Sequence, residues 1–305
     1  MRRSIAFGLV ATALLATGLA QAAPGERLRE RVAERTSGEP AQRAARPQTI
    51  AYGSDPLQQL DVWKADKAGG KAPLVMYVHG GGWKRGSKET AASRNAPAHF
   101  TREGYVYASI DYRLVPKNTV EDQARDVAQA LKALLEKADA LGIDRSRVVI
   151  MGHSAGAHLV ALVGTDEQYL RSAGLSFADI DGVIPNDGAA YDVPAQMRQA
   201  GRLMQDTYDQ AFGTDPARQR ALSPTLQAAS PNAPAFLLIH VQRKDGVAQA
   251  RELEAALRRA GTAVERREFA GQGLRGHMEI NRNLGDPDYP ATPVVDSWLK
   301  RIFAR

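Results

Sequence analysis

The chain has 305 residues, of which 44% are hydrophobic and 24% are charged, an ordinary balance for a globular protein with a full core. Its net charge of +6 is spread along the sequence, apart from an arginine-rich stretch near the start that also holds glutamates and no interleaved aromatic residues. This pattern argues against nucleic-acid binding. The lack of cysteine excludes disulfides, so packing alone must stabilise the fold.

The first residues have the features of a secretory signal. Met1-Arg2-Arg3 is a basic start, residues 5–19 form an apolar core, and Ala20-Gln21-Ala22 fits an A-x-A cleavage site. The apolar run is shorter than the roughly 20 residues that span a bilayer, so an uncleaved anchor is the less favoured alternative. We expect residues 1–22 to be removed from an exported, periplasmic or secreted bacterial protein, with no stable membrane insertion afterwards.

The next segment, residues 23–47, is rich in Arg, Glu, Ala and Pro and predicts a flexible arm before a folded domain over 48–305. Runs typical of strands occur at 49–52, 59–63, 74–78, 105–110, 148–151, 182–185, 235–241 and 264–269. Helical patterns lie at 120–141, 157–163, 247–260 and 292–303. This alternation predicts an α/β fold, a mostly parallel sheet with helices on both faces. Residues 188–232 lack the alternation and are expected to form a small cap.

A pentapeptide, Gly152-His153-Ser154-Ala155-Gly156, lies between the strand expected at 148–151 and a helix-compatible run. A G-x-S-x-G pattern in this context is the nucleophile elbow, a strained turn that lifts the serine hydroxyl clear of the sheet. The helix that follows points free N–H groups toward the reaction site. Chance is the alternative explanation, because the chain holds 27 glycines. The flanking strand and helix favour Ser154 as a nucleophile.

A second motif, His79-Gly80-Gly81-Gly82-Trp83, follows the buried strand expected at 74–78. Acyl transfer builds negative charge on a carbonyl oxygen, so backbone N–H groups must already point at that oxygen. Consecutive glycines let the backbone come close enough. We therefore predict Gly81 and Gly82 as oxyanion donors, with the N–H of Ala155 as a third, and His79 as a structural residue. An ordinary glycine-rich turn is the alternative.

The general base must follow the nucleophile in the chain, in the order serine, acid, histidine. Of the six histidines, only His240 and His277 lie far enough downstream of Ser154. His240 falls inside the strand expected at 235–241. His277 falls in a glycine-rich stretch, 271–277, that we expect to be a flexible loop after the last strand, where an imidazole can reach the elbow. We predict His277 as the base.

The predicted acid is Asp245, which follows the strand at 235–241 and precedes a helix. Its carboxylate would fix the tautomer of the base and stabilise the imidazolium. The alternative is that Asp245 merely caps the helix. Three other aspartates compete but fall before or inside the expected cap, namely Asp187, Asp192 and Asp209.

Taken in order, these motifs and Asp111-Tyr112-Arg113-Leu114 resemble the α/β-hydrolase superfamily. From about residue 48 onward, the chain is similar to carboxylesterases related to hormone-sensitive lipase and to bacterial feruloyl-esterase-like hydrolases. The resemblance implies Ser154 as nucleophile, His277 as base and Asp245 as acid, with no metal or cofactor. The chain departs from this pattern at Gln242-Arg243-Lys244, where relatives commonly place a glycine-containing turn, and Lys244 beside the acid can perturb its geometry.

These features predict a serine hydrolase that cleaves small-molecule carboxylic esters through an acyl-enzyme. An aryl-formamidase is one alternative, because H-G-G-x-W with Trp83 also resembles that family, although an export signal does not suit an intracellular reaction. A prolyl-oligopeptidase-type exopeptidase would need a large additional domain. A non-catalytic binding protein on the same fold is the third alternative, and it would be expected to lack a triad residue.

Overall fold

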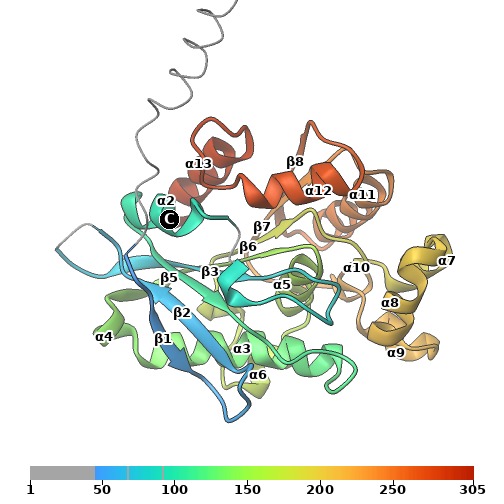
Figure 1. Ribbon diagram of the computed structural model, residues 1–305, viewed down its shortest axis with the longest axis horizontal. Coiled ribbons are helices and arrows are strands. Elements are labelled where there is room, and N and C mark those ends of the chain that lie inside the picture. Colours follow the sequence, from blue (N-terminus) through green and yellow to red (C-terminus); the bar gives the residue numbers. More distant parts are fainter. Residues whose placement is uncertain (1–44, 67–68, 91–92) are drawn as a thin grey trace, which may run out of the picture. The chain divides into compact units, whose positions relative to one another are not determined.

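Eight strands form one sheet in the part of the chain that the computed structural model describes, residues 45–66, 69–90 and 93–305 (Figure 1). The strands are β1 (Gln48–Ala51), β2 (Gln59–Trp63), β3 (Ala72–Val78), β4 (Val106–Ile110), β5 (Ile143–His153), β6 (Gly182–Asn186), β7 (Ala235–Val241) and β8 (Ala263–Phe269). Their order is β1-β2-β4-β3-β5-β6-β7-β8, and only β1 with β2 and β2 with β4 pair antiparallel. The predicted mostly parallel sheet is confirmed. The predicted signal, 1–22, and most of the predicted arm, 23–47, lie outside the described residues.

The helices cover both faces of the sheet. They are α2 (Ala96–Arg102), α3 (Val120–Glu136), α4 (Ala138–Leu141), α5 (Ala155–Thr165), α6 (Gln168–Ser172), α7 (Val193–Gln199), α8 (Arg202–Phe212), α9 (Pro216–Ala221), α10 (Pro224–Gln227), α11 (Lys244–Arg259), α12 (Gly273–Arg282) and α13 (Ala291–Phe303). Alternate side chains of β3 enter different cores: Leu74 and Met76 pack with α3, α5 and α11, whereas Val75 and Tyr77 pack with α2, α12 and α13. A strand buried on both faces explains the continuous apolar run in the sequence.

Strand register brings four loops to one edge of the sheet. Val78 of β3 is level with Gly152 of β5, and His153 of β5 is level with Asn186 of β6. Asn186 is in turn level with Ile239 of β7. Because these strands are parallel, their carboxyl ends meet at the same edge, where ligands bind in open α/β sheets. The glycine-rich loop, the elbow and the segments after β6 and β7 are therefore neighbours in space.

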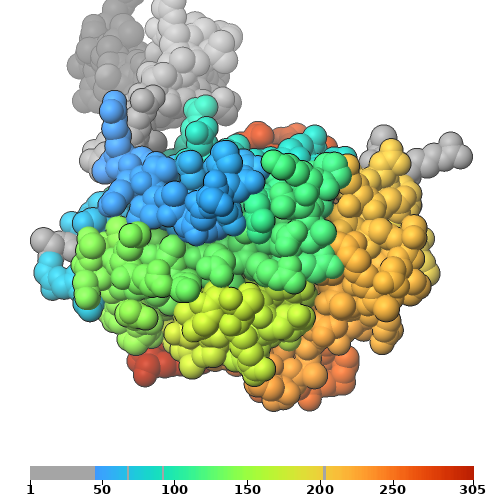
Figure 2. Space-filling view, turned by 90° about the horizontal axis from the view of Figure 1, so that it is seen from below, coloured from blue at the N-terminus to red at the C-terminus, as the bar shows by residue number. Residues whose placement is uncertain are grey.

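The segment between β6 and β7 holds α7, α8, α9 and α10, which lie together on one side of the molecule (Figure 1). Asp192 caps α7 and Asp215 caps α9 by accepting backbone N–H bonds. Helices without intervening strands explain why residues 188–232 lack the strand–helix alternation. Nε and Nη2 of Arg218 in α9 each donate to the carboxylate of Glu121 in α3 at 2.8 Å, and Figure 2 shows this gold segment beside the green region of α3.

Among the described residues, none of these helices is both long enough and apolar enough to cross a bilayer.

Candidate active site

The turn between β5 and α5 has the strand–turn–helix geometry that the sequence predicts. Ser154 lies at φ 56° and ψ −117°, a left-handed conformation that strains a residue with a side chain. An added Cβ at Gly156 would lie 2.2 Å from the carbonyl oxygen of Val78, and one at Gly152 would lie 2.3 Å from that of Gly156. Any side chain at these two positions would collide with backbone. The motif glycines thus allow the turn that presents Ser154.

His277 connects the serine to a carboxylate. Its Nε2 lies 3.0 Å from Ser154 Oγ, and its Nδ1 lies 2.5 Å from Asp187 Oδ2. An ionised carboxylate only accepts hydrogen bonds, so Nδ1 carries the proton and Nε2 is free to accept from the serine hydroxyl. His277 lies in α12 rather than in the flexible loop that we predicted. Its approach to Ser154 is therefore set by a helix that packs on the sheet.

Asp187 follows directly after β6 and is completely buried. Its Oδ1 accepts the backbone N–H of Val241 at 3.1 Å, and its Oδ2 lies 3.3 Å from Nε of Arg243. Burial by itself raises the pKa of Asp187. The hydrogen bond from His277, the charge of Arg243 and the Val241 N–H outweigh that effect and hold the pKa below its ordinary value. Asp187 is thus held as an anion next to His277.

The prediction that Asp245 partners His277 is wrong in this geometry. Asp245 lies in the first turn of α11, one-third exposed, and its Oδ2 accepts from Nη1 of Arg243 at 2.9 Å. Arg243 separates this carboxylate from Asp187, which already occupies the acceptor position on His277 Nδ1. The carboxylate that binds His277 therefore comes from the end of β6, one strand closer to β5 than the segment after β7.

The glycine-rich loop lies directly against the nucleophile. A Cβ at Gly80 would be 2.9 Å from Ser154 Cβ, so the loop and the elbow are in close contact. Gly81 has φ 126°, which a residue with a side chain rarely adopts. Within the described residues, the backbone N–H groups of Gly81, Gly82 and Ala155 have no hydrogen-bond acceptor. The three predicted oxyanion donors are therefore unused where the loop meets the N-terminus of α5.

Trp83 ties this loop to α5 and to the segment between β6 and β7. Its Nε1 donates to His158 Nδ1 at 3.3 Å, and His158 Nε2 donates to the carbonyl of Leu222 at 2.8 Å. The Trp83 ring also packs edge-on against Phe212 of α8, with centroids 4.8 Å apart. Burial lowers the pKa of His158 to about 4, so the ring stays neutral and keeps its acceptor for Trp83. The glycine-rich loop, residues 79–83, is thus held by α5 and by the segment between β6 and β7.

His153, the residue before the nucleophile, supports the base. Its Nε2 donates to the carbonyl oxygen of His277 at 2.9 Å, and the two rings lie 4.5 Å apart. Burial, followed by repulsion from His277, lowers the pKa of His153 to about 3, so this ring is neutral. The sequence predicts no role for His153 or Arg243. The only signal for His153 was its place inside the elbow motif.

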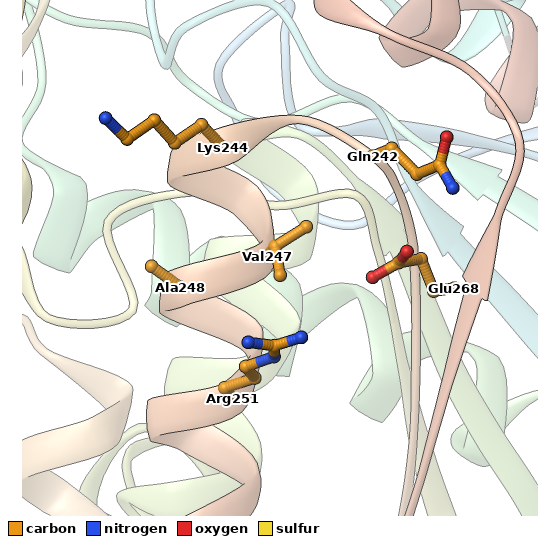
Figure 3. A pocket seen from close by; sticks show the side chains of 6 residues that line it. All are labelled: Gln242, Lys244, Val247, Ala248, Arg251 and Glu268. Atoms are coloured by element: carbon orange, nitrogen blue, oxygen red, sulfur yellow. The ribbon is translucent and has the colours of Figure 1, made fainter.

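Lys244 lies in the first turn of α11, next to Asp245. In Figure 3 its side chain points away from Gln242 and Glu268, and it lines a surface hollow with Gln242, Val247, Ala248, Arg251 and Glu268. None of these residues belongs to the hydrogen-bonded chain from Ser154 to Asp187. The described part of the chain also holds no cluster of three or more His, Asp or Glu side chains that could bind a metal ion.

A serine on a strained strand–helix turn, hydrogen-bonded through a histidine to a buried aspartate at the carboxyl edge of a mostly parallel sheet, defines an α/β hydrolase. The fold agrees with solved structures of this class. Esterase B from Lactobacillus rhamnosis superposes with a TM-score of 0.71 at 21% identity, covering 92% of this chain and 91% of that one. A further structure of esterase B, with a TM-score of 0.68, is described as inhibited by a tributyrin phosphonate.

Within that class, the chain belongs to the BD-FAE family, whose model matches residues 60–257. Esterase LipC from Mycobacterium tuberculosis is 30% identical over 241 residues, which are 76% of this chain and 57% of LipC. A kynurenine formamidase from Danio rerio is 26% identical over 257 residues, covering 81% of this chain and 79% of that protein. The chain thus spans a little over half the length of LipC.

Proposed function

We propose that the protein is an exported bacterial serine hydrolase that cleaves carboxylic esters through a covalent acyl-enzyme. The observation that carries this proposal is the unbroken hydrogen-bonded chain from Ser154 Oγ through His277 to Asp187. The unused N–H groups beside Ser154 add the second requirement for acyl transfer, a site for the oxyanion.

In the first half-reaction, His277 Nε2 takes the proton of Ser154 as Oγ attacks the ester carbonyl carbon. The carbonyl π electrons move to oxygen, and the resulting oxyanion is stabilised by the N–H groups of Gly81, Gly82 and Ala155. Each donor is worth about 2.7–4 kcal/mol in the transition state. Asp187 accepts from Nδ1 throughout and stabilises the imidazolium. When the C–O bond breaks, Nε2 gives its proton to the leaving alcohol.

In the second half-reaction, a water molecule takes the place of the alcohol. His277 Nε2 removes one of its protons, and the water oxygen attacks the acyl carbon. The oxyanion forms again among the same donors. Collapse of the intermediate releases the carboxylic acid, and Nε2 returns the proton to Ser154. No group outside the named residues is required for the proton or electron balance.

Support for an ester substrate comes from the relatives. LipC is named an esterase, and a structure of esterase B is described as inhibited by a tributyrin phosphonate. An activated serine attacks the electrophilic phosphorus of a phosphonate and displaces its leaving group, and the resulting tetrahedral adduct imitates the intermediate of ester hydrolysis.

A fluorophosphonate probe tests the proposal directly. We expect one equivalent to bind, and tandem mass spectrometry of the labelled protein should place the adduct on Ser154. Prior heat denaturation should abolish labelling, because the unfolded chain lacks the base. The matched control is Ser146, which lies on β5 and is exposed with its hydroxyl bound to Asp144. No adduct, or an adduct on Ser146, contradicts the catalytic assignment.

A second candidate reaction is hydrolysis of an aryl formamide. The similarity to a kynurenine formamidase over 81% of the chain favours it. Both reactions use the same triad, so labelling does not separate them. Parallel measurement of kcat/KM for phenyl acetate and for N-formylkynurenine does, and we expect the ester to be preferred. A preference for the formamide would replace the esterase proposal with the alternative.

Export rests on the basic start, the apolar run and the A-x-A site of residues 1–22. After expression of the full chain in a Gram-negative host, the protein in the periplasmic fraction should begin after Ala22 or Ala23. N-terminal sequencing checks this. A protein that keeps residue 1 and stays in the cytoplasmic fraction contradicts export while leaving the catalytic proposal intact.

A further inference from the structure

Arg243 lies between two carboxylates at the end of β7. Its Nε is 3.3 Å from Asp187 Oδ2, and its Nη1 is 2.9 Å from Asp245 Oδ2. Its Nη2 also donates to the backbone carbonyls of Asp187 and Gly188, at 3.3 and 3.1 Å. The Nε contact lacks hydrogen-bond geometry, so it is electrostatic, whereas the other arms fix the position of the guanidinium. Only 17% of this side chain is exposed.

From these contacts we infer that Arg243 is a positioning residue of the triad, with Asp245 as its outer partner. Its charge keeps the buried Asp187 an anion, and the N–H groups of its guanidinium hold the turn that carries Asp187. By opposing the charge of Asp187, Arg243 also reduces the negative potential that Asp187 places beside His277. This inference rests on the proposed function and extends it, because it predicts what sets the lower pH limit of the reaction.

The physical need for such a residue follows from where the acid lies. Asp187 is fully buried and has φ 44°, and among the described residues its carboxylate accepts hydrogen bonds from the Val241 N–H and from His277. A buried carboxylate without an opposing charge is costly, and it either takes up a proton or holds a neighbouring imidazole protonated. Both outcomes would leave Ser154 without a base. A fixed guanidinium prevents both.

Among the described residues around Asp187 and His277, Arg243 is the group that supplies the opposing positive charge. His153 faces His277 from β5 and is neutral, since burial lowers its pKa to about 3. Burial also lowers the pKa of His240 on β7. Three tyrosines nearby are neutral, because burial raises the pKa of Tyr191, Tyr208 and Tyr289. Asp245 is an anion and attracts Arg243 from the opposite side.

The experiment is the pH profile of kcat/KM for phenyl acetate at low ionic strength. With Arg243→Gln, we expect the acidic limb to move up by about one pH unit, since removing a nearby charge from a partly buried site has an effect of this size. The plateau should fall about tenfold. Arg243→Lys should keep the acidic limb near that of the unmodified protein while the plateau falls, because Lys retains the charge but not the fork.

Two further variants make the test decisive. Asp245→Asn should move the acidic limb down by about half a pH unit. The substitution removes an anion, so the charge of Arg243 is then opposed by Asp187 and no longer by Asp245. Arg266→Gln, which removes a guanidinium bound to Glu254 and His240, is the matched control and should leave the profile in place. If Arg243→Gln does not fold, as judged by circular dichroism, the opposite shift in Asp245→Asn still decides.

The inference is overturned if the acidic limb of both Arg243→Gln and Asp245→Asn stays within about 0.2 pH units of that of the unmodified protein. A purely structural role for Arg243 would leave the acidic limb in place. The proposed function fails in a different way. If the unmodified protein neither hydrolyses esters nor takes up the phosphonate, the catalytic assignment itself is wrong.

Discussion

Replacing Asp187 with Asn is expected to lower kcat/KM for a short-chain aryl ester by about 10⁴-fold, with the fold intact. The fully buried amide is isosteric with the carboxylate, so packing is preserved. The electrostatics are not, because the amide loses the charge that stabilises the imidazolium and can offer an N–H to His277 Nδ1. That arrangement places the imidazole proton on Nε2, which then cannot accept from Ser154. Steady-state kinetics at pH 8, beside a thermal unfolding curve, measure the effect.

Asp245→Asn is the matched control, because it makes the same chemical change one strand further from the nucleophile. We expect its kcat/KM at pH 8 to fall less than about fivefold, since Asp245 binds Arg243 and not His277. The reverse result, a large loss in Asp245→Asn and a small one in Asp187→Asn, would restore the acid that the sequence predicts. It would also mean that the turn after β7 rearranges when the substrate binds.

The features that the sequence identifies are those encoded by neighbouring residues. The G-x-S-x-G pattern requires a strand before it and a helix after it, and both are visible in the residues on either side of Ser154. The three glycines after the run at 74–78 are equally local. The strands themselves follow from apolar runs, so β2 and β7 were predicted with the bounds that the structure gives them.

The acid could not be found in this way, because its position depends on strand order. Asp187 becomes a partner of His277 only because β6 lies between β5 and β7, with the Asp187 N–H bound to the carbonyl of Ile239 at 2.7 Å. In the sequence, Asp187 is a polar residue at the start of a long segment without strands. The available signal is its position after an apolar strand, and in the sequence Asp245 also follows such a strand.

The helix that carries His277 was missed for a different reason. Gly271, Gly273 and Gly276 weaken the helical pattern, since glycine is a poor helix former and typical of loops. Tertiary packing decides the outcome. Gly276 and Gly271 come so close that a Cβ at Gly276 would lie 2.6 Å from the carbonyl carbon of Gly271, and Ile280 is buried against the sheet. The glycines serve close packing here, which a single sequence does not distinguish from flexibility.

The largest effect is expected from removing the nucleophile or the base. Ser154→Ala and His277→Ala should each lower kcat by about 10⁶-fold, and the double variant should lose no more than either single variant. The reason is that the two side chains act as one unit through the 3.0 Å contact between Oγ and Nε2. Without either partner, no acyl-enzyme forms and the other has no role.

The activity that remains in the double variant tests the oxyanion loop. Gly81, Gly82 and Ala155 keep their N–H groups in all three variants, so about 10³-fold acceleration over water should survive by stabilising direct attack of water. Long-time assays with repurified protein measure it, and heat-denatured double variant serves as the blank. If the losses of the single variants instead multiplied in the double variant, Ser154 and His277 would be acting independently. The structure would then hold a hydrogen-bonded pair that is not the catalytic one.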